Sequence, residues 1–307
     1  MCSGPHDREA HLAPVRSRPH NQTTLLDPAC KARTTIMDVD LHIHSTASDG
    51  VCSPEQVVEA ALAGRLDAIA LTDHDTMAGV ARAREAVAGR PLEVIAGIEV
   101  STTANGFELH ILGYFVDPEH PGIKAYEGSA GRRRDERMRE MVERLVELDV
   151  DVEFADVVEA AGDDRGNLGR PHLARALVGA GVVATVPEAF ERFIGNEHPA
   201  YVPTRLLTPE QGIALILEAG GVPIWAHPRD AELDRFFHTL VEAGLRGIEV
   251  YRPRTPQYRV LELERRARTA GILVSGGSDW HGPDDGSLGD FRVGSEEVRG
   301  LLAEGGM

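Results

Sequence analysis

Residues 38–50 read DVDLHIHSTASDG, an alternating apolar stretch that stops at two histidines, His42 and His44. Metal-binding residue types recur where later apolar runs stop, in segments 71–75, 97–100, 108–110, 225–228 and 276–281. A single histidine near a strand end is usually structural, and the His42–His44 pair alone is explained equally well by a polar strand end. Repetition along the chain instead predicts one cluster of metal ions that gathers all these side chains.

The chain is long enough for one large domain, or for a domain with an insertion, and its 42% hydrophobic residues suffice for a full core. No apolar run approaches the roughly 20 residues that a membrane-spanning helix needs. Residues 1–37 are rich in His, Arg, Pro and Thr and lack the apolar segment of a signal peptide. We therefore predict a disordered N-terminal tail, with a mis-assigned start codon as the alternative.

The cysteine content and the net charge limit the cellular compartment and the binding partners that the chain is expected to have. Two of the three cysteines lie in the predicted tail and the third is Cys52, without a CxxC pair or a disulfide framework, which predicts a cytoplasmic protein. The formal net charge of −17 disfavours double-stranded nucleic acid and anionic membranes as partners. An anionic substrate would need a local positive source, and bound divalent cations would supply one.

Strand-like apolar runs alternate with helical patterns, which predicts a parallel sheet with helices outside it. The expected strands are 36–44, 66–71, 92–100, 107–116, 222–226, 247–251 and 272–275, and the expected helices are 54–63, 77–88, 209–219, 231–243 and 256–270. The third and fourth strands are expected to pair across the Asn105-Gly106 turn. Because no GxGxxG motif occurs, a closed or distorted barrel is favoured over a doubly wound sheet.

The middle of the chain differs from the rest. Residues 122–201 keep helical periodicity without a clear strand. We predict a helical insertion there, which caps the mouth of a barrel formed by residues 38–121 and 202–307.

Functional side chains of such barrels sit at the carboxyl ends of strands, where all these segments are expected. Glu99 ends an apolar run, and a buried carboxylate is costly there unless it is paired or metal-bound. His110 and His227 are further candidate ligands, and Asp279 with His281 repeats the spacing of the first histidine pair. Mixed imidazole and carboxylate ligands suit manganese, iron or zinc more than calcium.

These segments together resemble the polymerase-and-histidinol-phosphatase (PHP) family of metal-dependent phosphoesterases. The matching motifs are DLHIHSTASDG, LTDHD, GIEVS with ELHILGY, AHP and GSDWHGP, in family order from Asp40 to Pro283. The resemblance implies a distorted (β/α)7 barrel with a trinuclear centre of divalent ions, manganese first, with zinc, iron(II) or magnesium as alternatives. In the implied scheme one ion is held by His42, His44, Glu99 and Asp279, a second by Glu99, His110 and His227, and a third by Asp49, His74 and His281.

Two features are similar to one subgroup, that of nucleoside 3′,5′-bisphosphate phosphatases and a related 5′-to-3′ exoribonuclease. Gly50 follows Asp49 where several family members have a histidine. The segment NLGRPHLAR, residues 167–175, resembles a subgroup helix start whose Arg and His contact substrate phosphate, which implies Arg170 and His172 as substrate-binding residues. A helix N-terminus attracts anions and an arginine can fork two phosphate oxygens, although an ordinary capped helix with a solvated arginine also fits.

The other basic run is Arg132-Arg133-Arg134. Acidic residues follow soon after it, so a solvated helix face explains the run more simply. We keep Arg133 as a weaker candidate for contact with a substrate phosphate.

The predicted reaction is metal-assisted hydrolysis of a phosphomonoester by an activated water. The expected substrate is the 3′-phosphate of a small nucleoside 3′,5′-bisphosphate, with a short RNA 5′ end as a further substrate. The expected catalytic residues are Glu99, Asp279, His281, Arg170 and His172, and a metal-bound water, His172 or His281 is the expected acid. Asp73 and Asp75 are expected to orient imidazoles or waters, whereas Glu249 fits a pocket role and a structural role equally well.

Competing interpretations remain within and outside the family. Histidinol phosphate or a cyclic phosphate would use the same barrel, but the predicted cap favours a small nucleotide or an RNA end. A non-catalytic nucleotide-binding protein would be expected to lack a ligand, and none of the nine positions is missing. A carbon–nitrogen hydrolase would carry a bridging lysine at a strand end, whereas the lysines are Lys31 and Lys124.

Overall fold

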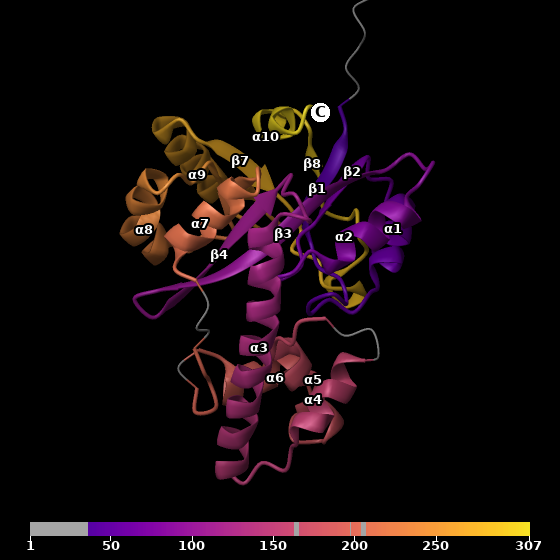
Figure 1. The fold of residues 1–307 in the computed structure, drawn as a ribbon, viewed down its shortest axis with the longest axis vertical. Helices are drawn as coiled ribbons and strands as arrows, with labels where there is room; N and C mark the ends of the chain where they lie inside the picture. Colours follow the sequence, from indigo (N-terminus) through magenta and orange to yellow (C-terminus); the bar gives the residue numbers. More distant parts are fainter. Residues whose placement is uncertain (1–35, 163–165, 197, 204–206) are drawn as a thin grey trace, which may run out of the picture. The chain divides into compact units, whose positions relative to one another are not determined.

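A computed structural model describes residues 36–162, 166–196, 198–203 and 207–307, so the predicted tail lies outside the described residues up to position 35. A mixed sheet with the strand order β7-β6-β5-β4-β3-β2-β1-β8 curls into a nearly closed barrel (Figure 1). The strands are β1 (Asp38–Ile43), β2 (Ala68–Leu71), β3 (Glu93–Ala104), β4 (Phe107–Tyr114), β5 (Val222–Trp225), β6 (Gly247–Tyr251), β7 (Leu273–Gly276) and β8 (Val293–Gly294).

Helices pack around these strands, with α1 and α2 on one side of the barrel and α7, α8 and α9 on the other (Figure 1). They are α1 (Pro54–Ala63), α2 (Ala78–Ala86), α7 (Pro209–Glu218), α8 (Asp230–Glu242), α9 (Gln257–Ala270) and α10 (Arg299–Glu304). At the start of α1, the Ser53 hydroxyl accepts the Gln56 N–H and the Gln56 side chain accepts the Ser53 N–H. This capping box satisfies backbone donors that a helix start otherwise leaves free. It explains why this helix begins where the sequence predicted.

The sheet is mixed rather than parallel throughout. β1, β2 and β3 are mutually parallel, as are β5, β6 and β7, whereas β4 runs antiparallel to both of its neighbours. The expected hairpin joins β3 to β4 through Asn105 and Gly106, whose φ angles of +52° and +82° are those of a type I′ turn. The predicted parallel pairs and the predicted β3–β4 hairpin are therefore present, whereas the antiparallel pairs β4–β5 and β1–β8 were not predicted.

The barrel closes where the segment after β7 meets β1. Ile43 forms a parallel bridge with Trp280, and the Asp279 N–H donates to the His42 carbonyl at 2.9 Å. Gly277 lies so close that a Cβ atom on it would stand 2.4 Å from the His42 nitrogen. The absence of a side chain at Gly277 thus lets the two ends of the barrel bring Asp279 beside His42.

The described residues between β4 and α7 contain helices and no strand. These helices are α3 (Pro121–Glu147), α4 (Phe154–Ala161), α5 (Arg170–Gly179), α6 (Val186–Ala189) and a π-helical turn (Phe190–Ile194). They share an apolar core of their own, which includes Met138, Met141, Leu145, Leu173 and Leu177. The long helix α3 continues from the barrel into this insertion (Figure 1). A distorted α/β barrel with a helical insertion, as predicted, is therefore confirmed.

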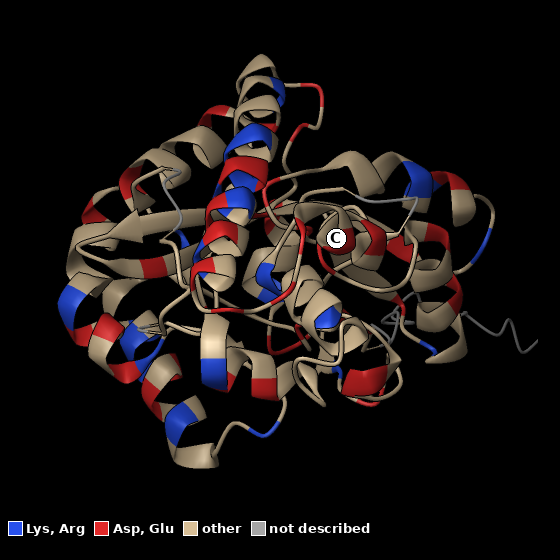
Figure 2. Cartoon of the chain, turned by 90° about the horizontal axis from the view of Figure 1, so that it is seen from below, with Lys and Arg blue, Asp and Glu red and all other residues tan. Residues whose placement is uncertain are grey.

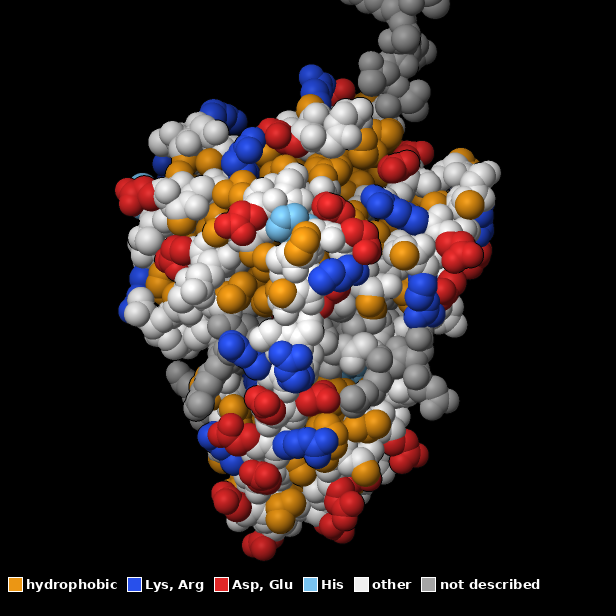
Figure 3. Space-filling model, viewed as in Figure 1, with side chains coloured by type: hydrophobic (Ala, Val, Ile, Leu, Met, Phe, Trp, Pro, Cys, Tyr) orange, Lys and Arg blue, Asp and Glu red, His pale blue; other side chains and the backbone are white. Residues whose placement is uncertain are grey.

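Charged side chains of both signs are interspersed over most helices (Figure 2). The end of the insertion farthest from the barrel carries several acidic side chains (Figure 3), and Glu143, Glu147, Asp149 and Asp151 are exposed there. Within the part of the chain that the structure describes, no helix combines the length and the apolar character needed to cross a bilayer.

Candidate metal centre

The nine predicted ligand residues come from all parts of the barrel and converge at one end of it. They are His42 on β1, His44 directly after β1, Asp49 before α1, His74 after β2, Glu99 on β3, His110 on β4, His227 after β5, and Asp279 and His281 after β7. A side-chain nitrogen or oxygen of each lies 3.0–3.4 Å from that of at least one other. The structure therefore brings together all nine positions.

Two of these residues lie inside strands rather than at strand ends, which corrects the expectation for them. β3 continues past Glu99 to Ala104, and His110 lies in the first half of β4. The β3–β4 hairpin pairs Ser101 with His110. Because β4 is antiparallel, its amino-terminal half lies at the same edge as the carboxyl ends of the parallel strands.

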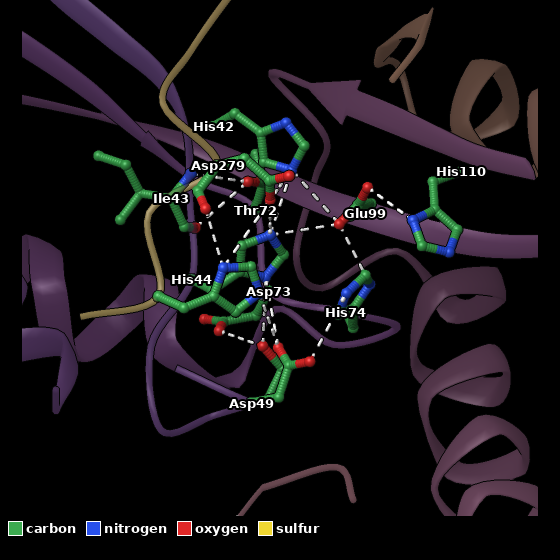
Figure 4. Close-up of polar contacts among 12 residues, drawn as sticks. His42, Ile43, His44, Asp49, Thr72, Asp73, His74, Glu99, His110 and Asp279 are labelled. Carbon is green, nitrogen blue, oxygen red and sulfur yellow. Dashed lines mark hydrogen bonds and ion pairs between the residues drawn. The ribbon is translucent and has the colours of Figure 1, made fainter. Parts of the chain in front are cut away.

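The Glu99 carboxylate stands between two groups of imidazoles (Figure 4). Its Oε1 lies 3.0 Å from His110 Nδ1 and 3.1 Å from His227 Nε2. Its Oε2 lies 3.3 Å from Nε2 of both His42 and His44. The Glu99 side chain is fully buried, so each of its oxygens faces one group without competition from bulk water. This geometry suits a carboxylate that bridges two ions.

A further cluster of metal-binding side chains surrounds Asp49. Asp49 Oδ1 lies 3.4 Å from His281 Nε2 and 3.8 Å from His44 Nδ1, and its Oδ2 lies 3.8 Å from His74 Nε2. The donor atoms of these four residues all lie within 4.8 Å of one another. His74 also connects this group to the first, because its Nδ1 is 3.1 Å from Glu99 Oε2.

Asp279 lies beside His42 and His44, and it has a hydrogen-bond partner, Arg252, that the sequence did not predict. Its Oδ1 lies 3.4 Å from His42 Nε2 and 3.3 Å from His44 Nε2. Its Oδ2 accepts a hydrogen bond from Arg252 Nη2 at 2.8 Å. Arg252 thus neutralises one oxygen and leaves the other directed at the histidines. No motif marks Arg252, although it closely follows the apolar strand that contains Glu249.

The buried polar atoms of this cluster fit metal ions. Among the described residues, Glu99 Oε2, Asp49 Oδ1 and His74 Nδ1 are buried without a hydrogen-bond partner, which is costly unless another group binds them. His42 Nε2 and His44 Nε2 face each other at 3.1 Å. Two nitrogens that are each about 2.1 Å from one ion lie about 3.0–3.4 Å apart in tetrahedral or octahedral geometry. An imidazole and carboxylate donor set suits manganese, iron or zinc.

The electrostatics of the cluster favour positive charge. Burial opposes ionisation of Glu99, Asp49 and Asp279, yet the surrounding histidines hold the pKa of each carboxyl well below its usual range. Burial also lowers the pKa of His110 and His281, but the neighbouring carboxylates outweigh it and raise each pKa to about 10. The carboxylates therefore attract cations to this place, whether protons or metal ions.

Glu249 contacts two of the histidines in this cluster without belonging to the predicted ligands. It is buried on β6, its Oε1 lies 2.9 Å from His42 Nδ1, and its Oε2 accepts the His227 backbone N–H at 2.8 Å. A carboxylate that accepts the Nδ1–H of an imidazole leaves the Nε2 lone pair free to bind a metal. For His42 that nitrogen is the one that faces Glu99.

Asp73 and Asp75 make their closest described contacts to groups other than imidazoles, and their role in orienting imidazoles or waters stays a prediction. Asp73 accepts hydrogen bonds from the backbone N–H and hydroxyl of Ser45 and from the Ser48 hydroxyl, each at 2.7 Å, so it shapes the loop after β1. Asp75 faces the insertion, where it accepts a hydrogen bond from Arg134 Nε at 2.6 Å. The φ angle of Asp75 is +57°, in the left-handed region that residues with side chains rarely adopt.

A pocket of about 260 Å³ opens beside His110 and His227, and Arg170 and Glu108 also line it. The Arg170 guanidinium donates to Asn196 Oδ1 at 2.9 Å and lies 3.6 Å from Glu108 Oε2. The structure thus places Arg170 at the mouth of the candidate metal centre, on the first turn of α5.

The remaining predicted substrate contacts lie elsewhere. His172 is buried, its Nδ1 accepts the Gly169 N–H at 2.9 Å, and burial lowers its pKa to about 4. Arg133 is exposed on α3 and lines a separate hollow with Glu136 and Val202. In the arginine run it is Arg134, not Arg133, that points inward.

Comparison with known proteins identifies relatives of this barrel. The sequence profile of the PHP domain matches residues 40–142. The chain is 34% identical to the 5′-3′ exoribonuclease Rnm of Salmonella typhimurium over 80% of this chain and 85% of that protein. It is 32% identical to a 3′,5′-nucleoside bisphosphate phosphatase of Chromobacterium violaceum over 81% of this chain and 89% of that protein. A crystal structure from Bifidobacterium adolescentis, provisionally described as a metal-dependent phosphoesterase, matches with a TM-score of 0.78 and 32% identity over 87% of this chain and 96% of that one.

Proposed function

The chain belongs to the PHP family, and from that premise we propose that it is a phosphatase that removes the 3′-phosphate of a nucleoside 3′,5′-bisphosphate. It is a metal-dependent hydrolase of phosphoric esters, and the nucleotide substrate is the proposed refinement. The observation that carries the proposal is the position of Glu99, whose two oxygens face two separate groups of imidazoles at 3.0–3.3 Å beside a pocket lined by Arg170.

We assign three divalent ions to the cluster, with manganese first. The first would be held by His42, His44, Glu99 and Asp279, the second by Glu99, His110 and His227, and the third by Asp49, His74 and His281. When bound, such ions lower the pKa of a water molecule towards neutrality and neutralise charge on the phosphoryl group. In this scheme Glu99 and Asp279 hold the ions in position, and neither residue transfers a proton.

Arg170 is suited to bind a substrate phosphate because its position is fixed in advance. Its guanidinium is held by Asn196 Oδ1 and by the Ile194 carbonyl, and it lies 5.5 Å from the Phe190 ring and 5.4 Å from the Tyr201 ring. A fixed guanidinium loses little freedom on binding and can donate two parallel hydrogen bonds to phosphate oxygens. The small pocket in front of it fits a nucleotide better than a long chain.

The leaving alkoxide would take its proton from solvent rather than from either predicted histidine. His281 Nδ1 lies 2.8 Å from the Asp279 carbonyl and its Nε2 faces Asp49, so as a ligand it has no free proton to give. His172 is buried and its pKa is lowered to about 4, so it is neutral near pH 7 and a poor acid. His172 instead fixes the start of α5, through Gly169, next to Arg170.

Hydrolysis at the 5′ end of RNA is the second candidate, favoured by the similarity to the exoribonuclease Rnm. The acidic side chains at the distal end of the insertion would repel a long nucleic acid, so this activity would act on short chains (Figure 3).

A substrate panel tests the proposal. Manganese-loaded enzyme is assayed with 3′-phosphoadenosine 5′-phosphate, a 5′-monophosphorylated oligonucleotide, histidinol phosphate and a cyclic nucleotide phosphate. We expect the highest kcat/KM for the bisphosphate. A preference for the oligonucleotide would replace the first candidate by the second, and phosphate release from histidinol phosphate alone would reject both.

A further inference from the structure

We propose that the helical insertion is a structural part of the third metal site, in addition to any contact that it makes with substrate. This inference rests on the proposed function, which assigns Asp49, His74 and His281 to one ion. Two of those residues, Asp49 and His74, lie on connecting loops of the barrel, and the insertion contacts both loops directly.

The first contact lies at the loop that carries Asp49. The Gly166 N–H donates to the Thr46 carbonyl at 2.9 Å, and the Asn167 N–H donates to the Ala47 carbonyl at 3.0 Å. Gly166 approaches so closely that a Cβ atom on it would lie 1.7 Å from the Ala47 oxygen. A side chain at Gly166 would therefore force the two loops apart.

The start of α5 presses on the same loop. A Cβ atom on Gly169 would lie 3.1 Å from Asp49 Oδ2, so the carboxylate stands against the first residues of the helix. Arg175, one turn further along α5, donates to the Asp49 backbone carbonyl at 3.4 Å. Both contacts fix the position of the Asp49 backbone and side chain against the insertion.

The second contact lies at the loop that carries His74. The Asn167 side chain donates from Nδ2 to the His74 carbonyl at 2.8 Å. Arg134, buried on α3, donates from Nε to Asp75 at 2.6 Å and from Nη2 to Ser101 Oγ at 2.9 Å. Asn167 thus touches both loops, while Arg134 ties the residue after His74 to β3.

The ligands of the other two sites are held by the barrel itself. His44, Asp279 and His227 closely follow strands, and their backbone N–H groups donate to the Trp280 carbonyl, the His42 carbonyl and Glu249 Oε2. His42, Glu99 and His110 belong to β1, β3 and β4, whose backbones are held by the hydrogen bonds of the sheet. A loop has no such ladder, so its position depends on what packs against it. Loosening the insertion should therefore weaken the third site alone.

The test is a count of bound ions in variants that leave every ligand in place. In the double variant Gly166→Ala with Asn167→Ala, the new methyl at 166 clashes with the Ala47 carbonyl and the hydrogen bond from the Asn167 side chain to the His74 carbonyl is lost. Gly179→Ala is the matched control because nothing lies within 4 Å of its added methyl. Manganese binding to each metal-stripped protein is measured by calorimetry and by elemental analysis after dialysis. Circular dichroism verifies that each variant is folded. A second variant, Arg134→Lys, keeps the charge but cannot reach all its present acceptors.

In wild type and control we expect three ions, and in the double variant one of the three should bind about 10–100-fold more weakly, the usual effect of losing a partner that orients a ligand. Unchanged binding of three ions in the double variant would overturn the inference, as would equal weakening of all three. Two ions in the wild-type protein would overturn it while leaving the phosphatase proposal intact. If the wild-type protein bound no manganese, both this inference and the phosphatase proposal would be overturned.

Discussion

The two sides of the metal centre are built on different kinds of structure. His42, Glu99 and His110 lie on sheet strands, whereas Asp49, His74 and His281 lie on connecting segments. Strand backbones are fixed by the ladder of hydrogen bonds, so the first side follows from forming the barrel. The loop side needs partners from outside the sheet, and here Asn167 and Arg134 of the insertion supply them. On the proposed assignment of the ions, one centre combines sites fixed by the fold with a site fixed by an added segment.

The largest expected effect comes from Glu99, the residue that contacts both sides. Glu99→Gln keeps the shape but replaces a bridging charge by an amide, so kcat should fall by several orders of magnitude while the melting temperature changes little. Steady-state phosphate release in excess manganese measures the loss. Glu93→Gln, at the exposed start of the same strand, is the control. Near-normal turnover by manganese-loaded Glu99→Gln protein would refute the assigned scheme.

A smaller effect is expected from Glu249, which supports only the strand side. Glu249→Gln weakens the acceptor of the His42 Nδ1–H, so ions held by His42 and His227 should bind about 10–100-fold more weakly. The third ion should bind as before, the reverse of the pattern expected for the insertion variant. Manganese titration of the metal-stripped protein measures both, with Glu264→Gln on α9 as the control. Selective loss of the third ion instead would contradict the division of the centre into two sides.

The smallest expected effect is a pH dependence of stability in metal-stripped protein. His110 on the strand side and His281 on the loop side each have a pKa raised from 6.5 to about 10 in the folded chain. The folded state then binds protons more tightly, so this stabilisation is complete below pH 6.5 and is lost as the pH rises through about 10. The melting temperature in a chelator should fall over that window.

Manganese should reduce this pH dependence, because bound ions displace the same protons. His110→Asn, on the strand side, and His281→Asn, on the loop side, should each reduce the fall of the melting temperature with pH. Melting curves recorded by circular dichroism at half-unit steps of pH measure it. A flat profile for the chelated wild-type protein would show that the carboxylates do not hold these protons.

Much of the barrel was predictable because its signals are local. Ser53 followed by Pro54 marks the start of α1, and the Asn105-Gly106 pair marks the β3–β4 turn, since few residues adopt positive φ at both positions. The short elements β8 and α10 were missed because two and six residues are too few to establish a period. The direction of β4 relative to β5 was also missed, because an apolar strand has the same pattern in either direction.

The candidate site was predictable in its ligands but not in its supports. Eight of the nine proposed ligand positions stand out because histidines and carboxylates interrupt apolar runs, whereas Asp49 was implied only by the resemblance to the PHP family. Arg252 and Arg134 carry no such mark, and their roles appear only when Asp279 and Asp75 are seen beside them. The φ angles of +30° at His227 and +58° at Asp279, rare for residues with side chains, likewise have no signal in the sequence.

The sequence by itself determined the kind of chemistry and the class of fold, because residue type, order and the spacing of apolar runs are properties of the chain. Only the tertiary structure decided which oxygen of Glu99 faces which histidines, and that Arg134 rather than Arg133 turns inward. The physical reason is that these outcomes depend on distances of a few ångströms between segments far apart in the chain. Such distances are set by barrel closure and by packing of the insertion, and no local pattern encodes them.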